Sequence, residues 1–393
     1  MRRRWASAIA VTAVAAVAAT GATGGRSAGG RCQRTLPGTA PSLPAAVVVA
    51  TSCGRFRLDT SGRVTYLGRR TLPVPRRARG YWADLTWYGF DRGHLLIGRG
   101  HRQLWRSRRR YAGTNPMNVG AVALGAHELA FSYIRRLRSY LYLAGYRSAE
   151  RLVARGETPL MFLPSGVTWR DRSRALLLRA PGGRRKRLLV PYASNPAVDD
   201  RSGVLVFRAG ERLGAIVRGR VRHLGDLRAL GVKGWPVIEP LGGVVSVHDR
   251  NRLVVLDYDG RLVASTPLPL RRQRADGVSS SVAANPDRTA FAFTATDGNT
   301  AYASRGHETV YALTAGERQA RQIFDEQLDF ADCERMAELA WHGEWLLYSA
   351  TEGRAAIVDS TSRAQPIELS GVIARLPGMQ SGGDGYFDVA WRQ

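Results

Sequence analysis

The sequence predicts an all-β protein that folds as a single β-propeller of four-stranded blades. Short runs of alternating apolar and polar residues are separated by turns rich in glycine, proline and aspartate. Units of this kind recur at intervals of roughly 40 to 50 residues, which is the period of propeller blades. A lone strand at the C-terminus also complements three strands near the N-terminus. A hydrophobic content of 44% is ample for a core, and 43 glycines with 18 prolines suit a turn-rich chain.

The clearest unit is Ser281–Phe324. Asn285-Pro286-Asp287-Arg288 reverses the chain after its first strand, because proline presets φ at the second turn position. Ala315-Gly316-Glu317 forms a later turn. The four strands are expected at residues 281–284, 289–295, 308–314 and 318–324. One such sheet cannot bury both faces, so it needs neighbouring copies.

Met1–Gly25 resembles a secretory signal peptide, with Arg2-Arg3-Arg4 followed by the apolar run Ala6–Ala19. We expect cleavage between Ala18 and Gly25 and a secreted, extracytoplasmic protein, exported by either the general or the twin-arginine route. Residues 26–45 are expected to form a flexible arm, and residues 46–393 the propeller. No later stretch approaches 18 apolar residues, so the mature chain is expected to lack a transmembrane span.

Strands are expected at residues 46–52, 55–59 and 63–67, one fewer than a blade needs. Tyr386–Trp391 would supply the fourth strand and close the ring, which hides edge strands. The first strands of the units begin at residues 83, 119, 159, 195, 235, 280, 337 and 386. This spacing predicts eight blades. Seven is the alternative, because the units at 83 and 195 are the least complete, and the former has a poor fourth strand.

Two segments have helix-compatible composition. Glu128–Ala154 alternates better at period two, so strands are favoured there. Residues 321–337 are expected to form an insertion between blades that carries a short helix and Cys333. The three cysteines of an exported chain indicate one disulfide. Cys32–Cys53 is the local pairing and Cys333 is the alternative partner. No spacing typical of a zinc site occurs, so no metal site is expected.

The segment SVAANPDRTAFAFTATDG (residues 281–298) and the C-terminal FDVAW resemble the WD40-like repeat of TolB-type propellers. Blades of that family open with a tryptophan strand, a proline-aspartate turn and an apolar strand. The resemblance implies the fold and transfers no functional residue. TolB-type proteins bind partner proteins of the cell envelope, so partner binding is implied by analogy alone.

The formal charge of +26 is concentrated in one part of the chain. Residues 55–187 hold 29 basic and 7 acidic residues, whereas residues 188–393 hold 23 basic and 25 acidic. Turns between second and third strands share one face of a propeller with the connections between blades. The arginines predicted on that face are Arg77, Arg79, Arg99, Arg102, Arg109, Arg110, Arg135, Arg136, Arg138, Arg172 and Arg174.

This pattern predicts a non-enzymatic, monomeric binding or scaffold module. Its basic face would take an anionic envelope polymer or an acidic protein surface, without specific recognition of nucleic acid. A GC-rich coding sequence is an alternative source of the arginines, since Lys186 and Lys233 are the only lysines.

The alternative function is a propeller enzyme (a hydrolase, lactonase or lyase) with a site at the central channel. Its candidate carboxylates lie in or beside first strands: Asp84, Glu239, Glu338 and Asp388. Asp199-Asp200 could form an acid/base pair, although its place at a turn between first and second strands is the favoured explanation. No nucleophile-elbow, SxxK or HExxH motif occurs, so no catalytic residue and no cofactor are assigned.

Overall fold

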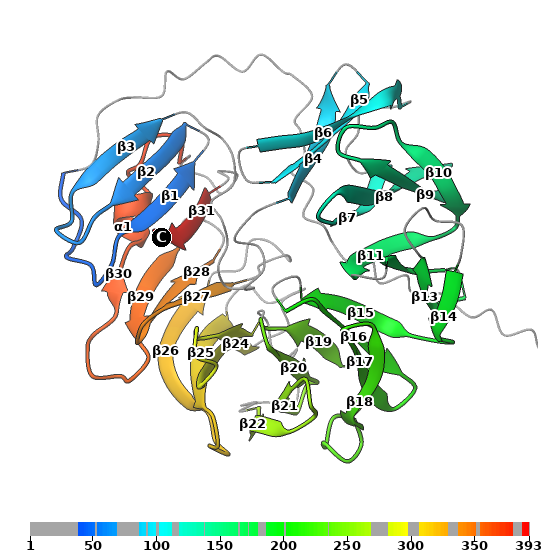
Figure 1. Cartoon of the computed structure of the whole chain (residues 1–393). Helices are drawn as coiled ribbons and strands as arrows, with labels where there is room; N and C mark the ends of the chain where they lie inside the picture. The colour runs from blue at the N-terminus through cyan, green and yellow to red at the C-terminus, as the bar shows by residue number, and fades with distance from the viewer. Residues whose placement is uncertain are drawn as a thin grey trace, which may run out of the picture. The chain divides into compact units, whose positions relative to one another are not determined.

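Eight antiparallel sheets follow one another along the chain (Figure 1). The structure is a computed structural model. It describes residues 38–392 except 52, 69–85, 92, 100–101, 112–117, 137, 164–165, 172, 180–185, 200–201, 235, 269–281, 298–305, 329–336, 351–353 and 380–386. Seven of the sheets have four strands and one has three. This succession confirms the predicted β-propeller and the count of eight blades.

Blade 1 joins the two ends of the domain. Its strand order is β3-β2-β1-β31, with β1 (Val47–Thr51), β2 (Gly54–Leu58), β3 (Val64–Gly68) and β31 (Phe387–Trp391). In the register of β1 with β31, Val49 lies opposite Val389 and Val47 opposite Trp391. The prediction that the C-terminal strand completes the N-terminal sheet is therefore confirmed.

The remaining blades are consecutive in sequence. Blade 2 holds β4 (Thr86–Asp91), β5 (His94–Arg99) and β6 (Arg102–Arg110). Blade 3 holds β7 (Val119–Leu124), β8 (Glu128–Arg135), β9 (Arg138–Gly145) and β10 (Arg151–Arg155). Blade 4 holds β11 (Thr158–Leu163), β12 (Gly166–Arg170), β13 (Leu176–Arg179) and β14 (Lys186–Val190). Blade 5 holds β15 (Ser194–Asp199), β16 (Val204–Ala209), β17 (Arg212–Val217) and β18 (Arg220–Asp226).

Blade 6 holds β19 (Val237–Pro240), β20 (Val244–His248), β21 (Arg252–Asp257) and β22 (Leu262–Pro267). Blade 7 holds β23 (Ala283–Ala284), β24 (Ala290–Asp297), β25 (Gly306–Thr314) and β26 (Arg321–Leu328). Blade 8 holds β27 (Glu338–His342), β28 (Trp345–Ser349), β29 (Ala355–Asp359) and β30 (Ile367–Glu368). Every observed first strand begins within three residues of its predicted start, because turn residues mark each boundary.

The core lies between consecutive sheets. A hydrophobic cluster fills each interface from blades 2 and 3 through to blades 8 and 1. Between blades 6 and 7, for example, Val244 and Val255 pack with Phe291 and Phe293, all four fully or almost fully buried. A four-stranded sheet on its own would leave one of these faces in water, so each blade depends on its neighbours.

Two tryptophans tie first strands together near the C-terminus. The indole N–H of Trp341 in β27 donates to the Ala283 carbonyl in β23 at 3.1 Å. The indole N–H of Trp391 in β31 donates to the Ala340 carbonyl in β27 at 2.8 Å. Both rings are buried, so the hydrogen bond satisfies a donor that would otherwise be desolvated without a partner. The two tryptophans therefore fasten blade 8 to blade 7 and blade 1 to blade 8.

The expectation of a flexible arm over residues 26–45 is wrong for residues 38–45. Ala40, Leu43 and Ala45 are buried in the cluster between blades 8 and 1. The Ala40 N–H donates to the Gly62 carbonyl at 2.8 Å. A side chain at Gly62 would lie 2.0 Å from the Ala40 carbonyl oxygen, so this approach requires glycine. The glycine and proline content of residues 26–45 indicated flexibility, but burial of the three apolar side chains holds residues 38–45 against the propeller. Residues 26–37 lie outside the described residues.

The predicted insertion over residues 321–337 begins later than expected. Arg321–Leu328 forms β26, which pairs with β25 along its length. The acidic, helix-compatible composition of this segment is overridden by pairing with a long neighbouring strand. Residues 329–336, including Cys333, lie outside the described residues. The short helix α1 (Ser370–Ile373), which sequence patterns did not indicate, instead packs Val372 and Ile373 into the cluster between blades 8 and 1.

Cys53 follows β1 and is disulfide-bonded. The prediction of one disulfide is confirmed, and a Cys32–Cys333 pair is excluded. Cys32 and Cys333 both lie outside the described residues, so each remains a candidate partner. Among the described residues, no helix has the length and apolar character of a membrane span.

Candidate functional site

Turns between second and third strands all open at one end of the sheets, because successive strands of a blade run in opposite directions. We call this end the top end. The described turns there include Arg136 after β8, residues 171–175 after β12, Gly210–Glu211 after β16 and residues 249–251 after β20. The top end is the face on which sequence analysis predicted the arginines.

The structure brings four of the predicted arginines to the top end with described side chains. Arg135, Arg136 and Arg138 form the β8–β9 turn, and Arg174 lies in the β12–β13 turn. Two more predicted residues have backbone positions at the same end, where β5 ends at Arg99 and β6 begins at Arg102. The predicted residues Arg77, Arg79 and Arg172 lie outside the described residues.

The prediction is wrong for Arg109 and Arg110. Sequence analysis placed Arg109 and Arg110 on the face of the turns and inter-blade connections, whereas β6 runs through Arg110. Because β6 starts at the top end, its last residues lie at the opposite end, where Arg110 pairs with His94. The run of arginines looked like a loop because arginine has no strong strand propensity. Pairing with β5 and burial of Trp105 and Ser107 hold it in a strand instead.

The β8–β9 hairpin holds three arginines under local strain. Arg135 lies directly opposite Arg138, and Arg136 occupies the left-handed region with a φ of 49°. Like charges facing each other across two strands destabilise a sheet, and a non-glycine residue at positive φ adds to that cost. All three residues are exposed. In the described part of the chain, none of their side chains forms a hydrogen bond or an ion pair.

A second hairpin makes an informative match at the opposite end of blade 5. In the β17–β18 turn, Arg218 has a φ of 50° and is followed by Gly219 and Arg220. Here Val217 lies opposite Arg220, and Gly219 takes the second left-handed position with a φ of 76°. Glycine suits this conformation at no steric cost. The two turns therefore share a left-handed arginine, and the β17–β18 turn lacks the like-charge pair of the β8–β9 turn.

Arg174 is held at the surface of blade 4 by a tyrosine. Its Nη1 donates to the Tyr192 hydroxyl at 3.0 Å, and its guanidinium carbon lies 5.9 Å from the centre of the Tyr192 ring. Arg174 also has a φ of 66°. Burial, together with the positive charge of Arg174, lowers the pKa of the nearby Arg170 below its usual range. Two arginines that repel each other at one turn favour an anion beside them.

Sequence reasoning missed Arg155 as a member of this surface. Arg155 ends β10, lies opposite Tyr140 on β9, and is exposed at the top end of blade 3. Its strand was predicted, so the alternation of residues along β10 contained the signal. The candidate site is the group formed by Arg135, Arg136, Arg138, Arg155 and Arg174, which we call the arginine surface.

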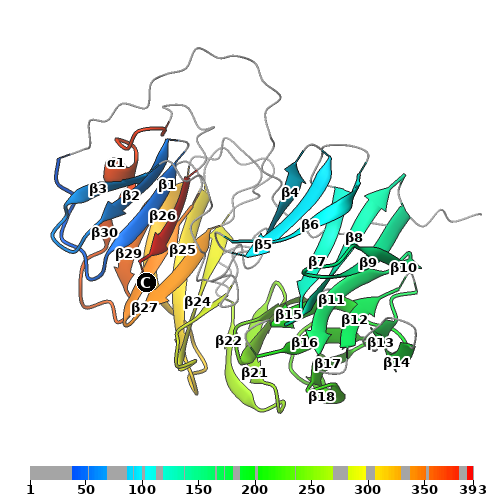
Figure 2. The same cartoon turned by 45° about the horizontal axis from the view of Figure 1, so that its top comes forward.

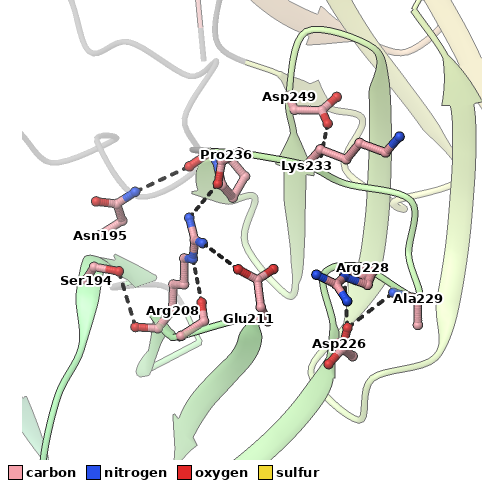
Figure 3. A network of polar contacts seen from close by, with 12 residues as sticks. Ser194, Asn195, Arg208, Glu211, Asp226, Arg228, Ala229, Lys233, Pro236 and Asp249 are labelled. Atoms are coloured by element: carbon pink, nitrogen blue, oxygen red, sulfur yellow. Dashed lines mark hydrogen bonds and ion pairs between the residues drawn. The ribbon is translucent and has the colours of Figure 1, made fainter.

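At the top end of blades 5 and 6, by contrast, charged side chains form hydrogen bonds within the protein (Figure 3). Arg208 donates to the Gly210 carbonyl at 2.6 Å, to the Gly234 carbonyl at 2.8 Å and to the Glu211 carboxylate at 3.2 Å. Asp249 accepts the Lys233 N–H at 2.6 Å, and Asp226 accepts the N–H of Arg228 at 2.9 Å. These contacts fix the connection between the two blades, so the charges there have structural partners.

The carboxylates proposed for an enzyme have structural partners where they are described. Asp199 is fully buried and accepts hydrogen bonds from the Gly243 N–H at 2.9 Å and the Tyr258 hydroxyl at 2.6 Å. Burial and the Asp199 charge raise the pKa of Tyr258 far above its usual range. Glu239 accepts the Val282 N–H at 2.9 Å. Asp199 thus joins blades 5 and 6, and Glu239 joins blades 6 and 7.

The remaining carboxylates proposed for an enzyme that are described lie in different blades. Glu338 begins β27 and is half-buried, and Asp388 lies in β31 opposite Ala50. Asp84 and Asp200 lie outside the described residues. Within the described ranges, no group of three histidine, cysteine, aspartate or glutamate side chains is arranged to hold a metal ion.

No protein-family model and no curated protein matches the chain. Several solved structures are similar in strand arrangement. BamB from Moraxella catarrhalis is 10% identical with a TM-score of 0.41, over 72% of this chain and 87% of that one. TolB from Acinetobacter baumannii is 11% identical with a TM-score of 0.31, over 58% and 64%. The WD40 domain of SCAP from fission yeast is 9% identical with a TM-score of 0.35, over 82% and 97%.

Proposed function

We propose that the protein is a non-enzymatic binding module whose arginine surface takes a ligand carrying a row of anionic groups. An anionic polymer of the cell envelope and an acidic protein surface share this chemistry. The observation that supports the proposal is the β8–β9 turn, where three exposed arginines have no side-chain partner among the described residues and Arg136 has a left-handed backbone conformation. Strain of this kind persists where function requires it.

The N-terminal sequence supports a place outside the cytoplasm for this activity. Arg2-Arg3-Arg4 and the apolar run after it have the layout of an export signal. Sequencing the N-terminus of the secreted protein tests this part of the proposal. A mature chain that still begins at Met1 would contradict it.

Binding is tested by retention of the mature chain on phosphocellulose over a salt gradient. The double variant Arg136→Glu, Arg138→Glu should elute at clearly lower salt than the wild type, because each lost phosphate contact reduces the salt dependence of binding. The control is Arg218→Glu, Arg220→Glu, which changes the charge equally at a hairpin where Arg218 has nearly the same φ as Arg136.

The two variants together decide the proposal. If both elute earlier by the same amount, retention depends on net charge alone and the arginine surface has no special role. If the β8–β9 variant elutes with the wild type, the proposal is wrong. A second matrix that carries poly-glutamate in place of phosphate separates an acidic protein surface from a phosphate polymer.

A further inference from the structure

One face of blade 3 carries several of the arginines at its top end. β8, β9 and β10 are neighbouring strands of this blade (Figure 2). Residues two apart along a strand share a face of the sheet, and so do residues directly opposite each other on neighbouring strands. Phe131 and Tyr133 in β8 are buried in the cluster that contains Trp105 of blade 2, so their face of the sheet is the one toward blade 2. Arg135 is the next residue of β8 on that face.

The strand register places two more arginines on this face. Arg138 lies opposite Arg135, and Tyr140, two residues further along β9, lies opposite Tyr133. Arg155 at the end of β10 lies opposite Tyr140. Arg135, Arg138 and Arg155 therefore lie around the half-buried Tyr140, and we call these three arginines the arginine triad.

The described residues near the triad offer it no counter-charge. The only acidic residue of β8, β9 and β10 is Glu128, which begins β8 at the opposite end of the blade. Glu157, the nearest acidic residue after Arg155, is buried and paired with Arg179 at 3.1 Å. All three arginines are exposed, and their side chains form no hydrogen bond or ion pair in the described part of the chain.

The spacing of the triad suits a single phosphate group. Directly opposite residues on neighbouring strands have Cβ atoms about 5 Å apart, and diagonal neighbours are about 7–8 Å apart. The long side chains of arginine bring three guanidinium groups at this spacing within reach of one anion. A phosphate monoester carries a charge of about −1.5 to −2 at pH 7 and has three strong acceptor oxygens. A carboxylate has a single charge and two oxygens, so it leaves the third arginine without an acceptor.

We propose that the arginine triad binds a phosphate monoester group carried by a glycan. The inference rests on the proposed function of the arginine surface and names its ligand class as a phosphorylated polysaccharide. The planar guanidinium of arginine donates two parallel N–H bonds to phosphate oxygens, which the ammonium group of lysine cannot do. The ring of Tyr140, at the centre of the triad, offers an apolar surface to the sugar that carries the phosphate. Arg136 at the tip of the β8–β9 turn and Arg174 on blade 4 supply attraction at longer range.

The test compares two matrices with the same polysaccharide backbone, phosphocellulose and carboxymethylcellulose. The mature chain is eluted from each with a salt gradient at pH 7.5. The triad variant is Arg138→Lys, Arg155→Lys, and the control is Arg136→Lys, Arg174→Lys, so both keep the net charge of the wild type. On phosphocellulose the triad variant should elute at a salt concentration at least a quarter lower than the wild type, and the control within a tenth of it. On carboxymethylcellulose both variants should elute within a tenth of the wild type.

Equal elution of the two variants from phosphocellulose would overturn the triad, and so would an equal shift of the triad variant on both matrices. Neither result affects the proposed function, which depends on the variant Arg136→Glu, Arg138→Glu. If that variant elutes with the wild type, the proposed function fails and the triad fails with it. Normal retention of the triad variant on carboxymethylcellulose shows that it is folded, so misfolding cannot produce the expected result.

Two competitors test the source of the phosphate. Phosphorylated dextran presents the monoester on a sugar, and vesicles that contain phosphatidic acid present it on a lipid. Phosphorylated dextran should release the wild type from phosphocellulose, and the vesicles should not do so at the same phosphate concentration. Release by the vesicles, or retention in the presence of phosphorylated dextran, would contradict the assignment to a glycan.

Discussion

Blades 3 and 5 both carry arginines at the top end, and they use them differently. In blade 5, Arg208 is almost buried and donates to two carbonyls and a carboxylate. In blade 3, Arg135, Arg136 and Arg138 are exposed on a strained turn, with no side-chain partner in the described part of the chain. The same residue type is therefore structural in one blade and available for a ligand in the other.

The polar contacts of blades 5 and 6 contribute to stability in a way that the β8–β9 turn of blade 3 does not. Blades 5 and 6 contain buried polar groups whose contacts hold neighbouring blades together, such as Asp199 and Arg208. Removing such groups leaves desolvated partners, which is expensive. The described residues of the β8–β9 turn contain no buried polar contact of this kind. Changes there should act on binding and leave folding almost untouched.

The largest expected effect concerns His248 in blade 6. Its ring is buried, and Nε2 has no partner among the described residues. Burial lowers the pKa of His248 from 6.5 to about 4, with Asp249 partly opposing the shift. The unfolded chain gains this proton first as the pH falls. Stability should therefore decrease between pH 6.5 and pH 4, by roughly 3 kcal/mol for this group.

Denaturant unfolding at several pH values measures this effect. The difference between wild type and His248→Gln removes the contribution of carboxyl groups that titrate in the same range. That difference should change across the window from pH 6.5 to pH 4 and be constant above it. A constant difference throughout would show that His248 has an ordinary pKa.

The next largest effect on stability is expected from a substitution of Arg208. Arg208→Ala removes two hydrogen bonds within the β16–β17 turn and one to Gly234 in the connection between blades 5 and 6, so the free energy of unfolding should fall by about 2 kcal/mol. Arg135→Ala should change this free energy by less than about 0.5 kcal/mol, because the residue is exposed and has no side-chain partner in the described ranges. Urea unfolding of the two variants tests the comparison directly. Equal losses would mean that the β8–β9 turn is also structural.

Glycine at position 136 should stabilise the protein. Arg136→Gly removes a side chain from the left-handed region, and the free energy of unfolding should rise by about 1 kcal/mol. Retention on phosphocellulose should decrease in the same variant. Arg218→Gly is the control, since it relieves the same backbone conformation without altering retention. A variant that is neither more stable nor less retained would remove the link between strain and binding.

The smallest effect separates charge from backbone strain. Arg135→Val places a valine opposite Arg138, as Val217 lies opposite Arg220 in the β17–β18 turn. Relief of the like-charge pair should raise the free energy of unfolding by about 0.3 kcal/mol at low salt. High salt should abolish the gain, because screening weakens the repulsion between exposed charges. A gain that persists in high salt would be due to the strand propensity of valine.

Much of the fold followed from local sequence patterns. The turn Asn285-Pro286-Asp287-Arg288 marked blade 7, and the strand at Trp391 was correctly paired with the N-terminal strands. Local patterns were insufficient where a neighbour decides the outcome. The composition of residues 38–45 indicates flexibility, but the hydrogen bond between Ala40 and Gly62 fixes them. The run of arginines up to Arg110 indicates a loop, but pairing with β5 makes it part of a strand.

The candidate site divides in the same way. Sequence analysis located the arginine-rich half and the β8–β9 turn, because charge and turn position are both local properties. It could not distinguish exposed arginines from Arg208, whose partners Gly234 and Glu211 meet it only in the folded blades. Nor could it find the role of Glu150 in blade 3, whose carboxylate accepts hydrogen bonds from the N–H groups of Arg108 and Arg109 in β6 of blade 2.

The sequence by itself determined the propeller class and the number of blades. Each of these depends on the period of strands and turns along the chain. The tertiary structure decided which arginines have partners, which carboxylates join blades, and which blade lacks a described fourth strand. Those properties depend on contacts between residues roughly 25 to 60 positions apart, such as Arg208 with Gly234 and Tyr258 with Asp199, which only packing of the blades brings together.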